Sequence, residues 1–287
     1  MALRVAYLGP RGTFTEEALV RIADRLPDEI DPVPVRTIRA AVDAVTEGDA
    51  DRALIPFENS IEGSVGATLD ALATNRAEPV IVAEEDVQIV HHLLARPEVR
   101  LEEVEVVLSH PQAAAQCERF LRDELAAASV RPTSSTADAI REVAESDERW
   151  AAIGSAAAGE LYGCRTLATD IADQAHNVTR FVLVAAAGSE ALTDAGLPRV
   201  TSLVFSELGE DRPGALTAAL AAFSDREVNL TRIESRPLGE GLGRYMFFID
   251  LDGDVAEPSV AAAVEGLGEV ADQVRVLGSF PVRRVPV

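Results

Sequence analysis

The segment DQAHNVTRFVLVA, residues 173–185, places polar side chains directly before an apolar, strand-like run. Arg180 offers a planar guanidinium that matches a carboxylate, and Thr179 offers a hydroxyl beside it. In a water-poor pocket this pair would hold an anionic substrate and donate a hydrogen bond or a proton to a leaving oxygen. The alternative is structural, with Arg180 paired to one of the chain's many acids and Thr179 an ordinary strand residue. The residues alone leave both interpretations open.

The segment IPFENSIEGSVGATL, residues 55–69, ends a predicted strand with a dense set of donors and acceptors. They are a carboxylate, a carboxamide and two hydroxyls, on Glu58, Asn59, Ser60 and Ser64. Binding residues concentrate in loops, so a ligand site is one interpretation. Asparagine and serine also cap helices routinely, and that is the other interpretation.

The segment YLGPRGTFTEEAL, residues 7–19, reads as a strand, a glycine-rich turn and a helix. Thr13 and Glu16 have the spacing of a capping box, and the free N–H groups at the helix start would attract an anion. The turn is no phosphate-binding P-loop, because that motif needs a lysine and the chain contains none. It does not match a dinucleotide fingerprint either, and a purely structural turn is the alternative.

The segment LSHPQAAAQ, residues 108–116, places His110 before a proline that suits the first helical position. His110 is a candidate general base, but no aspartate lies near it in sequence to orient it, so a structural role stays open. His91 and His92 are neighbours in a predicted strand and would point to opposite faces. Cys117 and Cys164 match no metal or redox spacing, so we expect buried free thiols and no metal site, with a disulfide between the two as the alternative.

The chain has 287 residues and a net charge of −22, from 48 acidic and 26 basic residues. Every basic residue is arginine. One hypothesis is a host with a salt-rich cytoplasm, where screening reduces the self-repulsion. A GC-rich genome is the alternative, which explains the missing lysine better than the acidity. A melting temperature that does not rise between low and molar salt would count against the first hypothesis.

The composition also excludes several classes of function. Nucleic-acid binding needs clustered cations, which this acidic chain does not supply. No apolar run approaches the 18 or more residues of a membrane span. The N-terminus MALRVAYLGP enters a predicted strand without the pattern of a signal peptide, so we expect a cytoplasmic protein.

Strand-like and helix-like segments alternate over residues 1–186, which predicts an α/β fold with parallel sheets covered by helices. Small and polar residues around 187–199 predict a linker. Residues 200–287 show the order βαββαβ, which is typical of a ferredoxin-like α+β domain. We expect this second domain to expose a sheet face or an edge for pairing.

Six ordered motifs together resemble the prephenate dehydratase family, and the similarity covers nearly the whole chain. They are GPRGTFTEEA, PFENSIEGSV, SHPQAAAQC, STADA, AAIGSAAAGELYG and NVTRF. The second domain resembles an ACT module, with RPGAL and IESRP where that module binds phenylalanine. Phe57 stands where an aliphatic residue is usual and Gly154 replaces a common alanine, and neither touches the expected chemistry.

The resemblance implies a catalytic domain over residues 1–186 folded like a type II periplasmic binding protein, with two lobes around a cleft. Lobe one would span about 1–75 and 170–186, and lobe two about 76–169. The NVTRF motif would then lie in the cleft, where the chain returns to lobe one. No chorismate mutase domain is expected before residue 1.

The implied activity converts prephenate into phenylpyruvate, with loss of carbon dioxide and water and no metal or organic cofactor. Thr179 would be the catalytic residue, Arg180 or helix N-termini would grip the side-chain carboxylate, and Phe181 would line the ring. The other implied substrate-binding residues are Asn177, Glu58, Asn59, Ser60, Thr13 and Gln112. Arogenate dehydratase is a close alternative, and a non-catalytic amino-acid sensor of the same architecture is an alternative from another class.

The ACT resemblance implies an L-phenylalanine effector bound between paired ACT domains in a homodimer or homotetramer. Asp211 and Pro213 would open the helix at the effector site. The implied effector-binding residues are Gly214, Ala215, Leu216, Asn229, Leu230, Glu234 and Ser235. A purely structural assembly module is the alternative.

Overall fold

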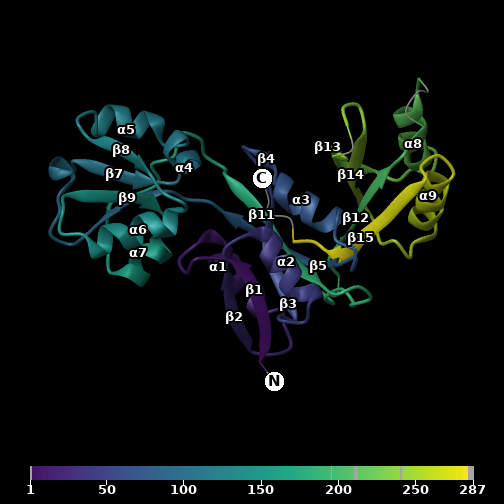
Figure 1. Cartoon of the computed structure of the whole chain (residues 1–287), viewed down its shortest axis with the longest axis horizontal. Coiled ribbons are helices and arrows are strands. Elements are labelled where there is room, and N and C mark those ends of the chain that lie inside the picture. The colour runs from purple at the N-terminus through teal and green to yellow at the C-terminus, as the bar shows by residue number, and fades with distance from the viewer. Residues whose placement is uncertain (1, 195, 210–212, 240, 284–287) are drawn as a thin grey trace.

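The computed structural model describes residues 2–194, 196–209, 213–239 and 241–283. It contains three separate sheets, two in the N-terminal α/β region and one in the C-terminal domain. Figure 1 shows the first lobe lying between the second lobe and the C-terminal domain. The expected fold class, a two-lobed α/β region followed by a βαββαβ domain, is therefore confirmed.

The first lobe is a mixed sheet with the strand order β2-β1-β3-β11-β5, and β4 pairs with β3. Its strands are β1 (Leu3–Leu8), β2 (Ile30–Val35), β3 (Arg52–Asn59), β4 (Gly63–Ser64), β5 (Val80–Gln88) and β11 (Val178–Ala185). Helix α1 (Phe14–Ala23) covers one face, and α2 (Ile38–Thr46) and α3 (Gly66–Ala73) cover the other. Thr13 and Thr37 cap α1 and α2 through their hydroxyls, which explains where these helices begin.

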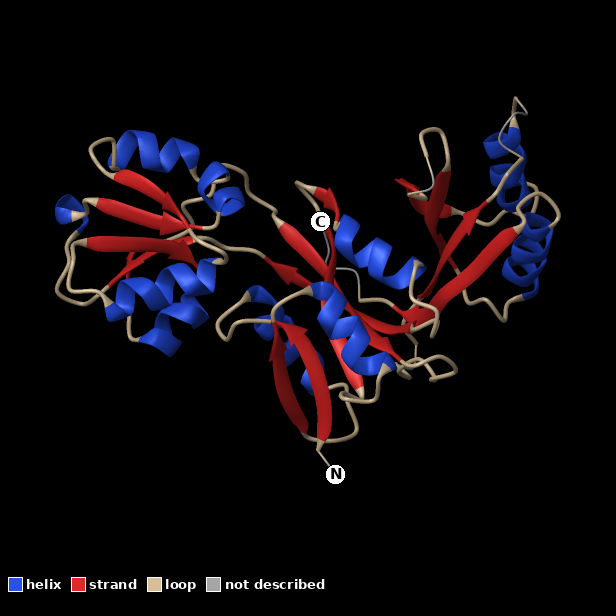
Figure 2. Ribbon diagram, viewed as in Figure 1, coloured by secondary structure: helices blue, strands red, loops and turns tan. Residues whose placement is uncertain are grey.

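The second lobe is a sheet with the strand order β10-β6-β9-β7-β8. Its strands are β6 (His92–Ala95), β7 (Val106–Ser109), β8 (Ser129–Pro132), β9 (Trp150–Gly154) and β10 (Arg165–Ala168). Figure 2 shows helices on both faces of this sheet. They are α4 (Pro111–Ala115), α5 (Glu118–Glu124), α6 (Thr136–Glu145) and α7 (Ala156–Tyr162), with a short 3₁₀ helix η1 at Leu101–Glu103.

The C-terminal domain is an antiparallel sheet with the strand order β13-β14-β12-β15 and two helices on one face. Its elements are β12 (Arg199–Ser206), α8 (Ala215–Ser224), β13 (Leu230–Pro237), β14 (Tyr245–Asp252), α9 (Pro258–Gly268) and β15 (Gln273–Pro281). The other face packs against the first lobe, because Val204, Met246 and Phe248 share one buried cluster with Phe57 and Leu69.

Two sequence-based expectations need correction. The chain leaves the first lobe between Gln88 and His92, not near residue 76, because β5 is the edge strand of the first sheet. The sheets are also mixed and not purely parallel, since β11 runs antiparallel to both β3 and β5. Strand β11 enters the sheet as the chain returns from the second lobe, so its direction is set by that crossing and not by a helical crossover.

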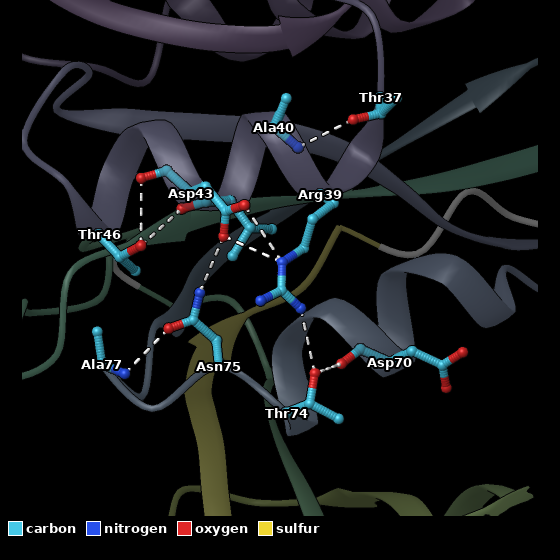
Figure 3. Close-up of polar contacts among 10 residues, drawn as sticks. Thr37, Arg39, Ala40, Asp43, Thr46, Asp70, Thr74, Asn75 and Ala77 are labelled. Carbon is cyan, nitrogen blue, oxygen red and sulfur yellow. Dashed lines mark hydrogen bonds and ion pairs between the residues drawn. The ribbon is translucent and has the colours of Figure 1, made fainter. Parts of the chain in front are cut away.

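Polar contacts fix helices α2 and α3 against each other, as Figure 3 shows. Arg39 binds Asp43 within α2 and donates to the Thr74 hydroxyl at the end of α3, at 3.2 Å. Asn75 donates to Asp43 at 3.4 Å. Helix α3 therefore has a fixed position from which Asp70 can bind the C-terminal domain.

The C-terminal domain is attached to the first lobe by close backbone packing and by ion pairs. A Cβ atom on Gly278 would lie 2.1 Å from the Ile81 carbonyl oxygen, so strand β15 approaches β5 at a distance that only glycine permits. Arg236 of β13 binds Asp70 through two nitrogens, at 3.2 and 2.7 Å. Arg275 donates to two carbonyl oxygens of the first lobe.

Candidate active site

A cavity of about 1030 Å³, here called the cleft, opens between the two α/β lobes. The first lobe contributes the end of β1, the start of α1 and the tips of β3 and β11. The second lobe contributes the starts of α4 and α6 and Tyr162 of α7. The Tyr162 hydroxyl donates to the Arg11 carbonyl oxygen at 2.9 Å, which joins the lobes at the cleft edge. Helix starts and strand ends thus meet at one cavity, as expected for α/β lobes.

Strand β11 sends alternate side chains to opposite faces of the first sheet. Thr179 and Phe181 line the cleft. Arg180 does not line it: its guanidinium lies on the other face, within 3.1 Å of Asp250, 3.6 Å of Glu58 and 3.7 Å of Glu84. The expectation that Arg180 grips a substrate carboxylate beside Thr179 is therefore wrong in geometry, because neighbours in a strand cannot share a face.

Two further residues expected at the substrate lie outside the cleft lining. Glu58 is paired with Arg180 across the β3–β11 ladder and shares its face. The Ser60 hydroxyl is used by the backbone, since it donates to the His176 carbonyl oxygen and accepts from the Val178 N–H. It fastens the tip of β11 to the loop after β3 and does not face the cavity.

Asn59 is the residue that orients Thr179. Its Oδ1 accepts from the N–H groups of Ile61 and Glu62, which identifies Nδ2 as the donor on the other side of the amide. Nδ2 donates to the Thr179 hydroxyl oxygen at 2.9 Å and to Asn177 Oδ1 at 2.7 Å. Because Thr179 accepts this bond, its own hydrogen is available to a group in the cleft.

The same amide chain continues into the second lobe. Asn177, only 2% exposed, donates to Gln116 Oε1 at 3.0 Å. His91 Nε2 lies 3.1 Å from the same oxygen and must therefore carry the hydrogen. Burial lowers the His91 pKa, which keeps the ring neutral at pH 7. Thr179 is thus held by a chain of neutral groups that spans both lobes.

The start of α1 lines the cleft as the sequence predicts, with one difference in its cap. Thr13 Oγ1 accepts from the Glu16 N–H, as in a capping box. The Glu16 carboxylate, however, accepts from the Gly12 N–H at 2.6 Å and not from the N–H of Thr13. Gln112 lines the cleft at the start of α4. His110 caps that helix, since its Nδ1 accepts from the Gln112 N–H at 3.3 Å. His110 therefore has a structural use at the cleft wall.

Three arginines that sequence reasoning missed line the cleft: Arg11, Arg36 and Arg141. Asp138 is the one acid among the described lining residues, and it is paired with Arg141 at 2.7 Å. Arg11 is paired with Glu16 at 3.3 Å, so Arg36 is the lining arginine without a carboxylate partner among the described residues. The lining still carries three arginines against one acid, within a chain of net charge −22. Arg11 lies in the glycine-rich turn before α1, so its place at the cleft could have been predicted from the sequence. Arg36 and Arg141 reach the cleft only through the tertiary fold.

The residues expected at an effector site fall on two faces of the C-terminal sheet. Gly214 caps α8 with φ of 85°, and Ala215, Leu216 and Leu230 pack together on the helix side. Ser235 shares that side, because it pairs with Phe247 of the same cluster. Glu234 pairs with Phe248 and faces the first lobe instead. Asn229 donates to Asp252 at 2.8 Å, and Asp211 lies outside the described residues.

The described ranges also bear on the cysteines, on metal binding and on membrane spans. Cys117 and Cys164 are free thiols there, and burial raises the Cys117 pKa to about 12. No group of three or more potential metal ligands occurs among the described residues. In the same part of the chain, no helix is long and apolar enough to cross a membrane.

Two α/β lobes around a cationic cleft, followed by a ferredoxin-like domain, define an ACT-containing α/β protein. A family model described as prephenate dehydratase matches residues 5–189, and a model of the ACT domain matches residues 207–269. The prephenate dehydratase of Mycobacterium bovis (strain BCG / Pasteur 1173P2) is 40% identical over 285 residues, which cover 97% of this chain and 87% of that protein. The chain therefore belongs to the prephenate dehydratase family.

Solved structures agree with this assignment. Prephenate dehydratase from Arthrobacter aurescens, in complex with L-Phe, matches with a TM-score of 0.87 and 39% identity, covering 99% of this chain and 94% of that chain. GqqA, described as a novel type of quorum quenching acylase, matches with a TM-score of 0.82 and 28% identity over 98% of each chain. GqqA thus has a similar fold but is described with a different activity. The fold alone therefore does not establish the chemistry of this chain, and the residues of the cleft have to support it.

Proposed function

We propose that this chain converts prephenate into phenylpyruvate. In that reaction the bond between the ring and its carboxylate breaks, and carbon dioxide leaves. The electron pair enters the ring, the ring carbon–oxygen bond breaks, and the departing hydroxide takes one proton to become water. Aromatisation supplies much of the driving force, so the protein has to position the substrate and assist the leaving oxygen.

The observation that carries the proposal is the Thr179 hydroxyl, which faces the cleft and accepts a hydrogen bond from Asn59. Its hydrogen would bond to the departing ring oxygen and supply a proton as the carbon–oxygen bond breaks. The Asn59 N–H would then stabilise the negative charge that develops on Thr179, and water would return the proton. Positioned acid assistance of this kind is typically worth about 10²–10⁴-fold in rate.

The substrate carboxylates have separate requirements. The side-chain carboxylate stays charged, and Arg11, Arg36 and the start of α1 are the described groups suited to it. The ring carboxylate becomes neutral carbon dioxide, so apolar surroundings favour its loss. Phe181 and Ile89 supply such surroundings beside Thr179. Thr13, Asn177 and Gln112 complete the proposed substrate contacts.

The charge of the cleft favours prephenate over arogenate. Arogenate carries an additional ammonium group, which needs a carboxylate partner. Asp138 is the one acid among the described lining residues, and Arg141 and the cap of α6 already engage it. A dianion without an ammonium group therefore fits the described groups better.

The test offers prephenate and arogenate separately to the purified chain, and measures phenylpyruvate formed from prephenate by its ultraviolet absorbance and phenylalanine formed from arogenate by amino-acid analysis. The expected result is turnover of prephenate with kcat/KM at least about tenfold above that for arogenate. Equal or higher efficiency with arogenate would overturn the substrate assignment. Absence of turnover with both would overturn the proposed reaction.

For the ACT domain we propose L-phenylalanine as the effector and a homodimer or homotetramer as the assembly. The relative from Arthrobacter aurescens, which binds L-Phe, supports the effector. Strand β13 is the edge of its sheet, and Ile233 (48% exposed) and Tyr245 (43% exposed) support pairing there. Sedimentation of the purified chain tests the assembly, and a monomer would contradict it. Thermal unfolding with and without L-phenylalanine tests the effector, and an unchanged thermal midpoint would contradict it.

The cytoplasmic location stays a prediction, which fractionation of the host cells would check.

A further inference from the structure

Arg180 connects the catalytic strand to the ACT domain. Its Nη1 lies 3.1 Å from Asp250 Oδ2, on strand β14 of the ACT sheet. Asp250 is 1% exposed, so its charge depends on protein partners and not on water. Burial opposes the charged form of Arg180, but the carboxylates of Glu84, Asp250, Glu58 and Asp86 outweigh it and raise its pKa.

Asp250 is shared between the two domains. The same Oδ2 accepts from Arg232 Nε at 2.8 Å, and Oδ1 accepts from the Ser202 hydroxyl. Arg232 is 7% exposed and belongs to β13, yet it also donates to the Ser64 hydroxyl of the catalytic domain at 3.2 Å. Its guanidinium lies over the Phe57 ring, 4.6 Å from the centroid. One carboxylate thus holds an arginine from each domain.

This cluster lies between the proposed effector strand and the proposed catalytic hydroxyl. Arg232 sits on β13 between Leu230 and Ser235, two residues of the proposed effector site. Arg180 directly follows Thr179 on β11. The path from β13 to Thr179 therefore has three steps: the ion pair Arg232–Asp250, the ion pair Asp250–Arg180, and the peptide bond between Arg180 and Thr179.

We infer that Arg180 is a positioning residue for the proposed dehydration, which holds β11 in register through Asp250. Both arginines bind the same oxygen, so a shift of β13 that draws Asp250 toward Arg232 loosens its bond to Arg180. Strand β11 then moves relative to Asn59, and the Thr179 hydroxyl leaves its productive position. A misplacement of about 1 Å can lower a rate by about 10²-fold, so a small displacement is sufficient. This inference rests on the proposed function.

The experiment compares Asp250→Asn with Asp70→Asn in the full chain. Asp70 also forms an ion pair between the domains, with Arg236, and within the described residues no hydrogen bond or ion pair joins its side chain to β11. In Asp250→Asn we expect kcat to fall about tenfold with the KM for prephenate within about twofold of the parent, because positioning acts on turnover. L-Phenylalanine should still raise the thermal midpoint but lose most of its effect on kcat.

In Asp70→Asn both kcat and the effect of L-phenylalanine should stay within about twofold of the parent. Equal values of kcat and equal L-phenylalanine effects in the two variants would overturn the inference. So would an Asp250→Asn variant that keeps the parental kcat and response. If Asp250→Asn does not fold, Arg180→Lys replaces it, because lysine keeps the positive charge but lacks the planar guanidinium. Its kcat and the effect of L-phenylalanine on kcat should change in the same direction, to a smaller degree. A parental response in Arg180→Lys would then overturn the inference.

The outcomes separate this inference from the proposed function. If the parent chain does not turn over prephenate, the proposed function fails, and the inference that rests on it is overturned with it. If the parent turns over prephenate but ignores L-phenylalanine, the proposed effector fails, and the difference in kcat between the two variants still decides whether Asp250 positions β11.

Discussion

The two faces of strand β11 hold their side chains by different kinds of interaction. On the cleft face, the side chains of Thr179, Asn59 and Asn177 bind only amides, a hydroxyl and backbone groups. On the opposite face, Arg180 meets a cluster of carboxylates that includes Asp250 of the ACT domain. Neutral hydrogen bonds fix direction without long-range fields, which suits a group that must aim one hydrogen. Ion pairs tie whole elements together, which suits a domain junction.

The TRF portion of the motif is therefore not one functional unit. Thr179 and Phe181 belong to the cleft, and Arg180 belongs to the junction behind it. Changes on the cleft face should therefore alter turnover and leave stability nearly unchanged. Changes behind the sheet should alter stability or the coupling between domains.

The largest effect is expected from Thr179→Ala. Loss of the hydroxyl removes the proposed donor to the leaving oxygen, so kcat should fall by about 10²–10⁴-fold. Thr179→Ser keeps the hydroxyl and should stay within about tenfold of the parent, since only a methyl group and some positioning are lost. Steady-state kinetics and thermal unfolding of both variants provide the measurement. Near-normal turnover by Thr179→Ala would remove the basis of the proposed chemistry.

A smaller loss, about 10–10²-fold in kcat, is expected from Asn59→Asp. The carboxylate can still accept from the N–H groups of Ile61 and Glu62, so the loop after β3 keeps its shape. It cannot donate to Thr179, and it would instead accept the hydrogen that Thr179 has to offer the substrate. The melting temperature of the variant serves as the control for the fold. Unchanged kcat would show that Asn59 does not orient the hydroxyl.

On the opposite face, Gly278→Ala should lower the free energy of unfolding by about 1–3 kcal/mol, the typical cost of overpacking. The added Cβ would collide with the Ile81 carbonyl oxygen, which is backbone and cannot rotate away. Gly268→Ala is the matched control, because a Cβ there meets no heavy atom within 4 Å and alanine favours the helix. Denaturant titration of both variants gives the comparison. Equal stabilities would show that β15 and β5 are not in close packing.

Much of this arrangement could be predicted from the sequence, because it depends on local pattern. The alternation of elements predicted an α/β fold, the family resemblance implied its two lobes, and the βαββαβ order predicted the second domain. All three are confirmed. The lobe boundary near residue 76 was wrong, because an apolar strand gives no sign of which sheet it joins. The side of Arg180 was open to prediction, since Arg180 was placed at the entrance of a strand with Thr179 next to it, and neighbours in a strand point to opposite faces. Adjacent residues of the NVTRF motif therefore need not serve the same site.

The cationic cleft could not be predicted in the same way. Arg36 and Arg141 come from different lobes, and only the tertiary fold brings them to one cavity with Thr179. Their neighbours in sequence are ordinary helix starts and helix faces, so no local spacing marks them. The acidic composition pointed in the opposite direction, because net charge describes the surface as a whole and not one cavity.

The smallest predicted effect concerns Asp86, which lies opposite Arg180 in the β5–β11 ladder. Burial raises the pKa of its carboxyl, and Arg180 offsets this only in part while Glu85 and Glu58 add to it. The folded chain therefore holds this proton more tightly than the unfolded chain. The free energy of unfolding should then fall as the pH rises from the ordinary aspartate pKa through the raised value.

Asp86→Asn removes this cost of ionisation, so its melting temperature should exceed that of the parent by a few degrees at pH 8. The difference should shrink as the pH is lowered toward the ordinary aspartate pKa, where the parent carboxyl is protonated as well. Asp49→Asn changes the net charge equally at an exposed position and is the matched control. If both variants shift the melting temperature alike at every pH, general charge repulsion explains the gain. A specific gain for Asp86→Asn would show that the carboxylates behind β11 carry more negative charge than Arg180 can neutralise.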